Sequence, residues 1–242
     1  VMAEQNRKQL NELIGGIAAG DHKQGSIEQK IGDLYNMAMD TTRRDAEGIA
    51  PVKPFLDEIA ALQREDLSAF LGKSMQCGMW GMYVDADEMN SSMNILKECQ
   101  AGFALGEKEY YFDTDEQTLR IRNAYEKHIE NMFALYGYEN AAALAQTVLR
   151  METRLAGAAK NNVELRDPQA NYNKMSIEEF KALVPEVDWD AFFAAMEITT
   201  DSLSVGQIGH LKEAGKMLAE EPIEDIRTYF VWQVMDGSAS YL

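Results

Sequence analysis

Apolar side chains recur at helical spacing in one segment after another, and this periodicity constrains the fold more than any other feature of the chain. The clearest stripe near the start consists of Ile27, Ile31, Leu34, Tyr35 and Ala38. Ser26 precedes this stripe and Gln29 follows three residues later, which is the pattern of a capping box at a helix N-terminus. The segment therefore predicts an amphipathic helix.

Helices of the same kind are predicted along most of the remainder, where capping residues, first-turn prolines and terminal glycines mark their ends. The expected spans are a helix beginning at Pro51 or Pro54, then 114–137, 144–159, 176–183, 188–196, 207–220 and a last helix from 222 onward. Gly48 and Gly137 are the expected stops of the first and third of these helical regions. The short link after Gly137 predicts two antiparallel neighbours.

One segment breaks the helical rule. Two short runs, Trp80 to Val84 and Met93 to Cys99, are separated by a polar loop over residues 85–92. They predict a single antiparallel hairpin at about 80–99. With no repeat and no Pro/Gly/Ser-rich linker in the sequence, the predicted fold class is mainly α. We expect one multi-helix domain over residues 1–242 with this one small hairpin.

The two cysteines lie on either side of the predicted hairpin. If Val84 opposes Met93, Cys77 falls about opposite Cys99 or Gln100, so a disulfide between Cys77 and Cys99 is geometrically conceivable. The alternative, which we favour, is two buried thiols that pack as small apolar groups.

Charge and chain ends limit the partners. The net charge of −17 opposes binding to nucleic acid and to anionic membrane surfaces, which depends on clustered Lys and Arg. No apolar run approaches the ~18 residues of a membrane span. The chain starts with Val, shows no signal-peptide pattern and is already helical at both ends, so we expect a piece of a longer protein.

The residues that could carry chemistry do not form a recognisable active site. The three histidines, His22, His128 and His210, have no second histidine four residues away, so the His-Glu-x-x-His zinc motif is absent. The acidic run Asp85, Asp87 and Glu88 fails the calcium-loop template, because Asn90 replaces the turn glycine and no Glu closes the loop. We expect no catalytic residue and no metal ligand within the chain.

A series of short motifs, in order along nearly the whole chain, resembles the N-terminal helical lobe of the neprilysin-like, or endothelin-converting-enzyme-like, zinc endopeptidases. The motifs are Lys30-Ile31-Gly32-Asp33-Leu34-Tyr35, Gly48-Ile49-Ala50-Pro51, Gln100-Ala101-Gly102-Phe103-Ala104-Leu105, Tyr110-Tyr111, Arg166-Asp167-Pro168, Tyr172-Asn173-Lys174-Met175, Asp188-Trp189, Val205-Gly206-Gln207 and Tyr241-Leu242. Gly106 stands where the family's Gly-Leu-x-Leu-Pro segment has proline, which indicates a looser turn there.

The resemblance implies a two-lobed peptidase in which this lobe caps a central chamber and restricts access to small peptides. Zinc and the catalytic residues belong to the C-terminal lobe, so the implied partners are oligopeptide substrates and that second lobe, with no membrane contact by this segment. The family's substrate-carboxylate arginines lie near the start of this region. That part is largely missing here and the nearest aligned position is Ala3, so no substrate-binding residue is carried over. The implied compartment is the bacterial cell envelope, the periplasm or the extracellular space, with the cytoplasm as a further alternative.

Two hypotheses follow. The first is the N-terminal lobe of a zinc endopeptidase, inactive in isolation. The second is a stand-alone helical binding or scaffold protein related to that lobe, which the missing zinc motif motivates.

Overall fold

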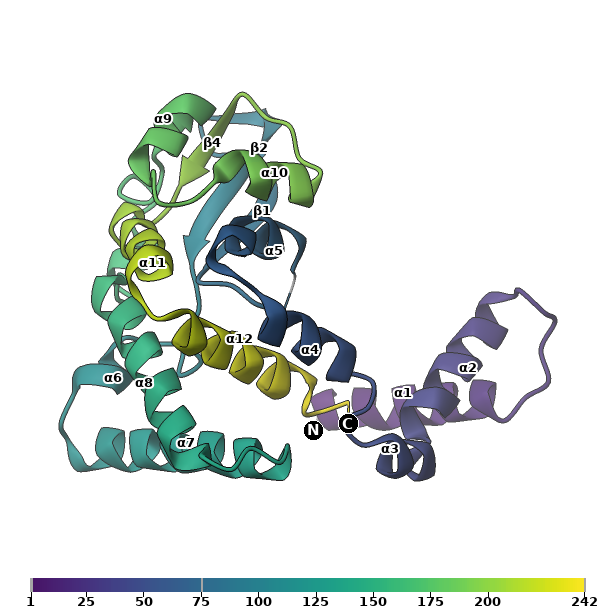
Figure 1. The fold of residues 1–242 in the computed structure, drawn as a ribbon. Coiled ribbons are helices and arrows are strands. Elements are labelled where there is room, and N and C mark those ends of the chain that lie inside the picture. Colours follow the sequence, from purple (N-terminus) through teal and green to yellow (C-terminus); the bar gives the residue numbers. More distant parts are fainter. Residues whose placement is uncertain (1, 75, 242) are drawn as a thin grey trace. The chain divides into compact units, whose positions relative to one another are not determined.

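The computed structural model describes residues 2–74 and 76–241 as a mostly helical chain with one small sheet (Figure 1). The chain divides into two compact units. Unit 1 comprises Val1–Lys53 with Ser238–Leu242, and unit 2 comprises Pro54–Gly237.

Unit 1 is built on a helical hairpin. Helices α1 (Met2–Ala18) and α2 (Ile27–Met39) pack together and α3 (Thr41–Glu47) follows. The predicted cap is confirmed, because the Ser26 hydroxyl accepts a hydrogen bond from Gln29 N at 3.2 Å. The helical region ends at Gly48 as predicted, but it breaks at Asp40, whose side chain accepts from Arg43 N and so begins a new helix. Much of the apolar stripe is solvent-exposed, including Ile27 and Leu34.

Unit 2 contains the remaining elements. Its α-helices are α4 (Lys53–Ala61), α5 (Leu67–Lys73), α6 (Glu109–Phe112), α7 (Glu116–Leu135), α8 (Ala141–Ala158), α9 (Ile177–Leu183), α10 (Trp189–Met196), α11 (Ile208–Glu220) and α12 (Ile223–Ser238). Two 3₁₀ turns, η1 (Arg64–Asp66) and η2 (Glu164–Arg166), complete the set. The helices predicted from 114, 144, 176, 188, 207 and 222 are all confirmed within a few residues, and α7 and α8 pack together as expected.

The local signals that predicted these helices act as expected. Asp115 and Asp188 each accept backbone N–H bonds at the starts of α7 and α10. Ser176 and Glu179 form a reciprocal capping box at the start of α9. Gly137 takes a left-handed φ of 87° just after α7, where a side chain would be strained.

The sheet is larger than the single hairpin that the sequence predicted. Strands β1 (Trp80–Asp87), β2 (Asn90–Gln100), β3 (Lys174–Ser176) and β4 (Ser202–Val205) form one sheet in the order β1-β2-β4-β3. β1 pairs antiparallel with β2, β2 pairs parallel with β4, and β4 pairs antiparallel with β3. Figure 1 shows β2 between β1 and β4.

The predicted hairpin register was wrong. Val84 opposes Leu96 instead of Met93, because both strands continue into the polar stretch that we expected to be a loop. β3 and β4 escaped prediction because each is only three or four residues long and β3 runs directly into the cap of α9.

The core of unit 2 is aromatic. Trp232, Tyr229 and Phe230 of α12 are almost fully buried, and Phe133 of α7 lies with them. A second cluster joins the sheet to α9 and α10. Its rings belong to Trp80, Phe180, Trp189, Phe192 and Phe193. Aromatic pairs at 4.4–6.0 Å contribute about 0.5–1.5 kcal/mol each beyond their buried area.

Candidate functional site

The three histidines are used in local contacts. His22 Nε2 lies 2.8 Å from Ile17 O in unit 1. His128 is half exposed, with its ring edge-on to Trp232 and Nε2 3.7 Å from a carboxylate oxygen of Asp236. His210 is fully buried with Nε2 3.0 Å from Ala101 O, and this burial lowers its pKa to about 4. Among the described residues, no group of three or more His, Cys, Asp or Glu side chains could hold a metal ion.

The acidic run at the hairpin tip makes ion pairs. Lys97 Nζ lies 3.3 Å from Asp85 Oδ2 and 2.6 Å from Glu88 Oε1. Asp87 is buried and accepts hydrogen bonds from Lys174 Nζ at 2.8 Å and from the Tyr172 hydroxyl at 2.7 Å. These bonds, led by that from Lys174, lower the pKa of Asp87 to about 2. The tip is therefore tied to β3, in place of the solvated loop that we expected.

Both cysteines are free thiols in the structure. The expected register placed Cys77 about opposite Cys99 or Gln100. In the structure Gly81 opposes Cys99 and Trp80 opposes Gln100, so Cys77 lies elsewhere. The Cys77 thiol donates to Phe230 O at 3.5 Å, and burial raises its pKa to about 12. Cys77 therefore behaves as a packing residue, in line with the alternative that we favoured.

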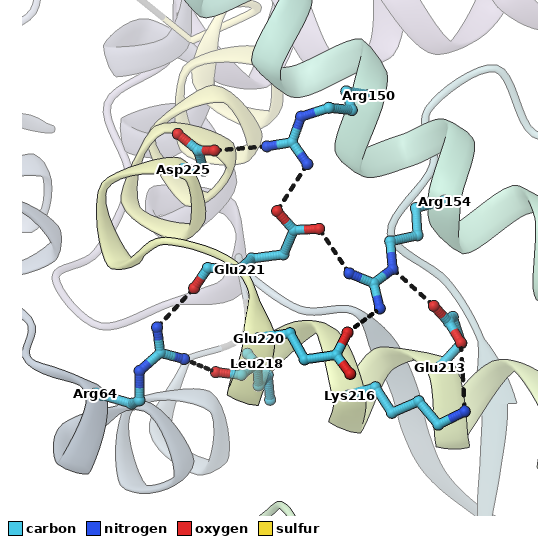
Figure 2. Close-up of polar contacts among 9 residues, drawn as sticks. All are labelled: Arg64, Arg150, Arg154, Glu213, Lys216, Leu218, Glu220, Glu221 and Asp225. Carbon is cyan, nitrogen blue, oxygen red and sulfur yellow. Dashed lines mark hydrogen bonds and ion pairs between the residues drawn. The ribbon is translucent and has the colours of Figure 1, made fainter.

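The most highly connected charged cluster braces the corner between α11 and α12 (Figure 2). Glu221 at this corner accepts from Arg150 Nη1 and from Arg154 Nη1, both at 2.7 Å. Arg154 also binds Glu213 and Glu220, and Arg150 binds Asp225. We call this set, with Arg64, the corner network.

Arg64 completes the corner network from the opposite side. It comes from η1, and its guanidinium donates to the carbonyl oxygens of Leu218 and Glu221. Those carbonyls lie at the C-terminal end of α11, where orphan acceptors and the helix dipole favour a cation. The network thus joins η1, α8, α11 and α12 by charge-assisted bonds.

A second polar network lies inside the helices. Glu152 of α8 is buried, and its two oxygens accept from the Tyr111 hydroxyl at 2.7 Å and from the Tyr125 hydroxyl at 2.8 Å. Each hydroxyl in turn accepts an N–H, from Leu105 N and from Trp232 Nε1. Burial raises the pKa of Glu152 to about 7 although these donors oppose the shift. Glu152 is 1% exposed and both of its oxygens are hydrogen-bonded, so we assign it to the framework.

Glu98 of β2 is another buried acid, with a pKa that burial raises to about 8. One carboxyl oxygen lies 3.4 Å from Gln207 N, and the other has no hydrogen-bond partner among the described residues. Among the described residues, Glu98 belongs to no group of three or more His, Cys, Asp or Glu side chains that could hold a metal ion.

A half-open pocket of about 700 Å³ lies beside the start of β1 in unit 2. Its apolar walls come from Trp80, Met82, Phe192, Met196 and Ile198. Sequence reasoning missed it, because the pocket joins α5, β1 and the end of α10, which lie far apart along the chain.

The fold and the sites together define a helical framework domain with a small mixed sheet. Comparison with known proteins agrees. The chain matches the model for the N-terminal part of peptidase family M13 over residues 1–242. It is 22% identical to endothelin-converting enzyme-like 1 of Mus musculus, over 97% of this chain and 33% of the relative. It is 23% identical to endothelin-converting enzyme 1 of Cavia porcellus, over 99% and 34%.

Solved structures give the same result. The zinc metalloprotease Zmp1 of Mycobacterium tuberculosis, in complex with an inhibitor, superposes with a TM-score of 0.91 at 26% identity, over 99% of this chain and 38% of that one. PepO of Lactobacillus rhamnosis shares the fold with a TM-score of 0.75 at 18% identity, over 97% and 38%.

The chain belongs to peptidase family M13. The resemblance drawn from the ordered motifs is therefore confirmed, and the chain spans about a third of the length of the curated relatives it matches.

Proposed function

We propose that this chain is the N-terminal, chamber-capping lobe of a zinc-dependent endopeptidase that hydrolyses oligopeptides. The observation that carries the proposal is the match to peptidase family M13 over the whole chain, together with the TM-score of 0.91 to a zinc metalloprotease. In this proposal units 1 and 2 both belong to that one lobe.

The described residues do not fit a zinc site, because they bring no three ligating side chains together. We therefore place zinc and the catalytic residues in the part of the protein that this chain does not span. Nor is any helix of the described chain long and apolar enough to cross a membrane. The compartment stays a prediction.

The role that remains for this chain is steric. A lobe that selects peptides by size must be rigid, and two hydrogen-bond networks connect the helices of unit 2. The corner network fixes α8, α11 and α12 to η1, and the Glu152 network fixes α7, α8 and α12 from inside. The corner network is built from charge-assisted hydrogen bonds, which are about twice as strong as neutral ones.

The test compares the isolated chain with the full gene product. We expect the 242-residue chain to bind no zinc stoichiometrically and to leave an internally quenched peptide uncut. The gene downstream of Leu242 should encode His-Glu-x-x-His, and the full product should cleave the peptide in a chelator-sensitive way. A stop codon soon after Leu242 would contradict the proposal and favour a stand-alone binding protein. About one tightly bound zinc per isolated chain would also overturn it.

A further inference from the structure

The outer edge of β1 is open. The sheet order places β1 at an edge, and within the described part of unit 2 it forms a ladder with β2 alone. Proteins usually protect such edges with charges, prolines or bulges. The bulge between Ala86 and Asp87 and the acid Asp85 protect only the far end of this strand. The stretch from Trp80 to Val84 has no charge and no proline.

The second half of this stretch, Tyr83 and Val84, is exposed and has a high β-propensity. Tyr83 is 48% exposed and Val84 is 59% exposed. Their side chains alternate to opposite faces of the strand, so both faces are accessible beside the open edge. A strand of this kind is a template on which another extended chain can form main-chain hydrogen bonds.

The 700 Å³ pocket adjoins the same stretch. Trp80, Gly81 and Met82 of β1 line it, together with Met196 and Ile198 from the end of α10 and the segment after it. An added strand would project alternate side chains toward one face of the sheet, where such a pocket can receive one of them.

Two polar side chains of the pocket, Gln233 and Ser74, already have partners in its own wall. Gln233 exchanges two hydrogen bonds with the Gly78 backbone, at 2.8 and 2.9 Å, and the Ser74 hydroxyl accepts from Cys77 N at 3.0 Å. What the pocket offers is therefore apolar surface, which suits an aliphatic side chain.

Charge decides the kind of chain that fits. Glu197 lines the pocket and is exposed, and its side chain makes no hydrogen bond or ion pair among the described residues. It is held in a left-handed conformation with φ 58° at the end of α10. The cation in the same lining, Lys73, is already paired with Glu58 at 3.0 Å. The net charge of −17 opposes a second copy of this chain on the same edge and favours a cationic one.

We propose that the open edge of β1 binds an extended, basic peptide as an added strand. An aliphatic side chain of the peptide enters the pocket between Met82 and Ile198, and a neighbouring Lys or Arg pairs with Glu197. The inference rests on the proposed function, because it names the class of peptide that the lobe would hold. It concerns binding alone and requires no zinc.

The experiment uses the 242-residue chain and a fluorescent probe, acetyl-Lys-Val-Lys-Val-Lys-Val-Lys-amide, at moderate salt. Anisotropy gives its Kd, and hydrogen exchange is followed over residues 80–87. Three control peptides are used. One is the alternating Glu-Val analogue, and the other two are probes N-methylated at every second amide, each blocking one edge of the peptide. Glu197→Lys tests the charge. Glu139→Lys, an exposed acid in the link between α7 and α8, is the matched control with the same change in net charge.

We expect saturable binding that slows amide exchange in β1. The Glu-Val peptide should bind with at least a tenfold weaker Kd. Only one of the two N-methylated probes should lose affinity, by about tenfold. Glu197→Lys should weaken binding at least fivefold more than Glu139→Lys. Unchanged exchange in β1, or equal weakening by the two variants, would overturn the inference. So would protection of β1 that rises with protein concentration in the absence of peptide. None of these results depends on peptidase activity, so the inference can fail while the proposed function stands.

Discussion

Replacing Glu221 by glutamine removes the central charge of the corner network, in which Arg150 and Arg154 each donate to it at 2.7 Å. The Glu221 side chain is only 8% exposed. Hydrogen bonds to charged groups contribute about 1.5–3 kcal/mol each. The glutamine oxygen keeps one guanidinium donor, while its NH₂ group meets the other donor and cannot accept from it.

The expected loss is therefore about one such bond, or about 2 kcal/mol of unfolding free energy, since the half-exposed Arg150 regains water. For a domain of this size that corresponds to a fall in Tm of about 4–8 °C. The matched control is Glu220→Gln, which removes a single contact to Arg154 from a side chain that is 60% exposed. A surface pair of that kind contributes at most about 1 kcal/mol.

The pH dependence gives an independent check. Burial by itself raises the pKa of Glu221, yet Arg150 and Arg154 outweigh it and hold the pKa below its usual range. A carboxylate with a lowered folded-state pKa stabilises the fold above its unfolded pKa of about 4.3, and this stabilisation is lost as pH falls through the folded value. The Tm gap between the parent and Glu221→Gln should thus be largest near pH 7 and should shrink below about pH 4.

Thermal unfolding followed by circular dichroism, from pH 7 down to about pH 3, measures both effects. Equal Tm losses for Glu221→Gln and Glu220→Gln would refute the reasoning, because burial of the carboxylate would then have no consequence. A gap that is independent of pH would refute the assignment of an ionised Glu221.

Three further predictions concern other parts of unit 2. Glu152→Gln should weaken the pH dependence of the unfolding free energy measured in urea. The reason is that a folded-state pKa raised to about 7 makes the parent lose stability as pH rises from about 4.3 to 7. An unchanged pH dependence would show that Glu152 ionises normally. Gly102→Ala should cost more than about 2 kcal/mol, since φ is +88° and the added Cβ would lie 2.5 Å from the Tyr229 hydroxyl. Gly106→Ala, also at positive φ but with open space around it, should cost only about 1 kcal/mol in the same urea titration. Thiol titration of unfolded, unreduced protein should find both cysteines free, and Cys77 should react slowly in the folded state because burial keeps its thiol protonated; fewer than two thiols after unfolding would indicate a disulfide.

Local structure was predictable because its causes are local. Ser26, Asp115, Ser176 and Asp188 cap helices through hydrogen bonds to backbone groups two or three residues away. Gly137 stops α7 for an equally local reason, its positive φ. Such signals are read directly from short stretches of sequence.

The sheet and the sites depend on contacts between distant residues, which spacing along the chain does not reveal. The hairpin register was wrong because polar residues of β1 and β2 face ion-pair partners such as Lys174, so the strands extend further than their apolar runs. β4 is only four residues long and pairs with β2 about a hundred residues away. Neither Arg64 nor Glu221 stands in any local pattern that would have marked it as a partner of the other.

The corner network has a consequence for folding during synthesis. Arg64 and its carbonyl partner Glu221 are 157 residues apart in sequence. At about 5–20 residues per second, Glu221 is added to the chain roughly 8–30 s after Arg64. During that interval the Arg64 guanidinium has none of its native acceptors, although α4, α5 and the hairpin are already complete. The segments that are synthesised first therefore stay hydrated or bound by a chaperone until the end of α11 has been synthesised. Only then can unit 2 complete its packing.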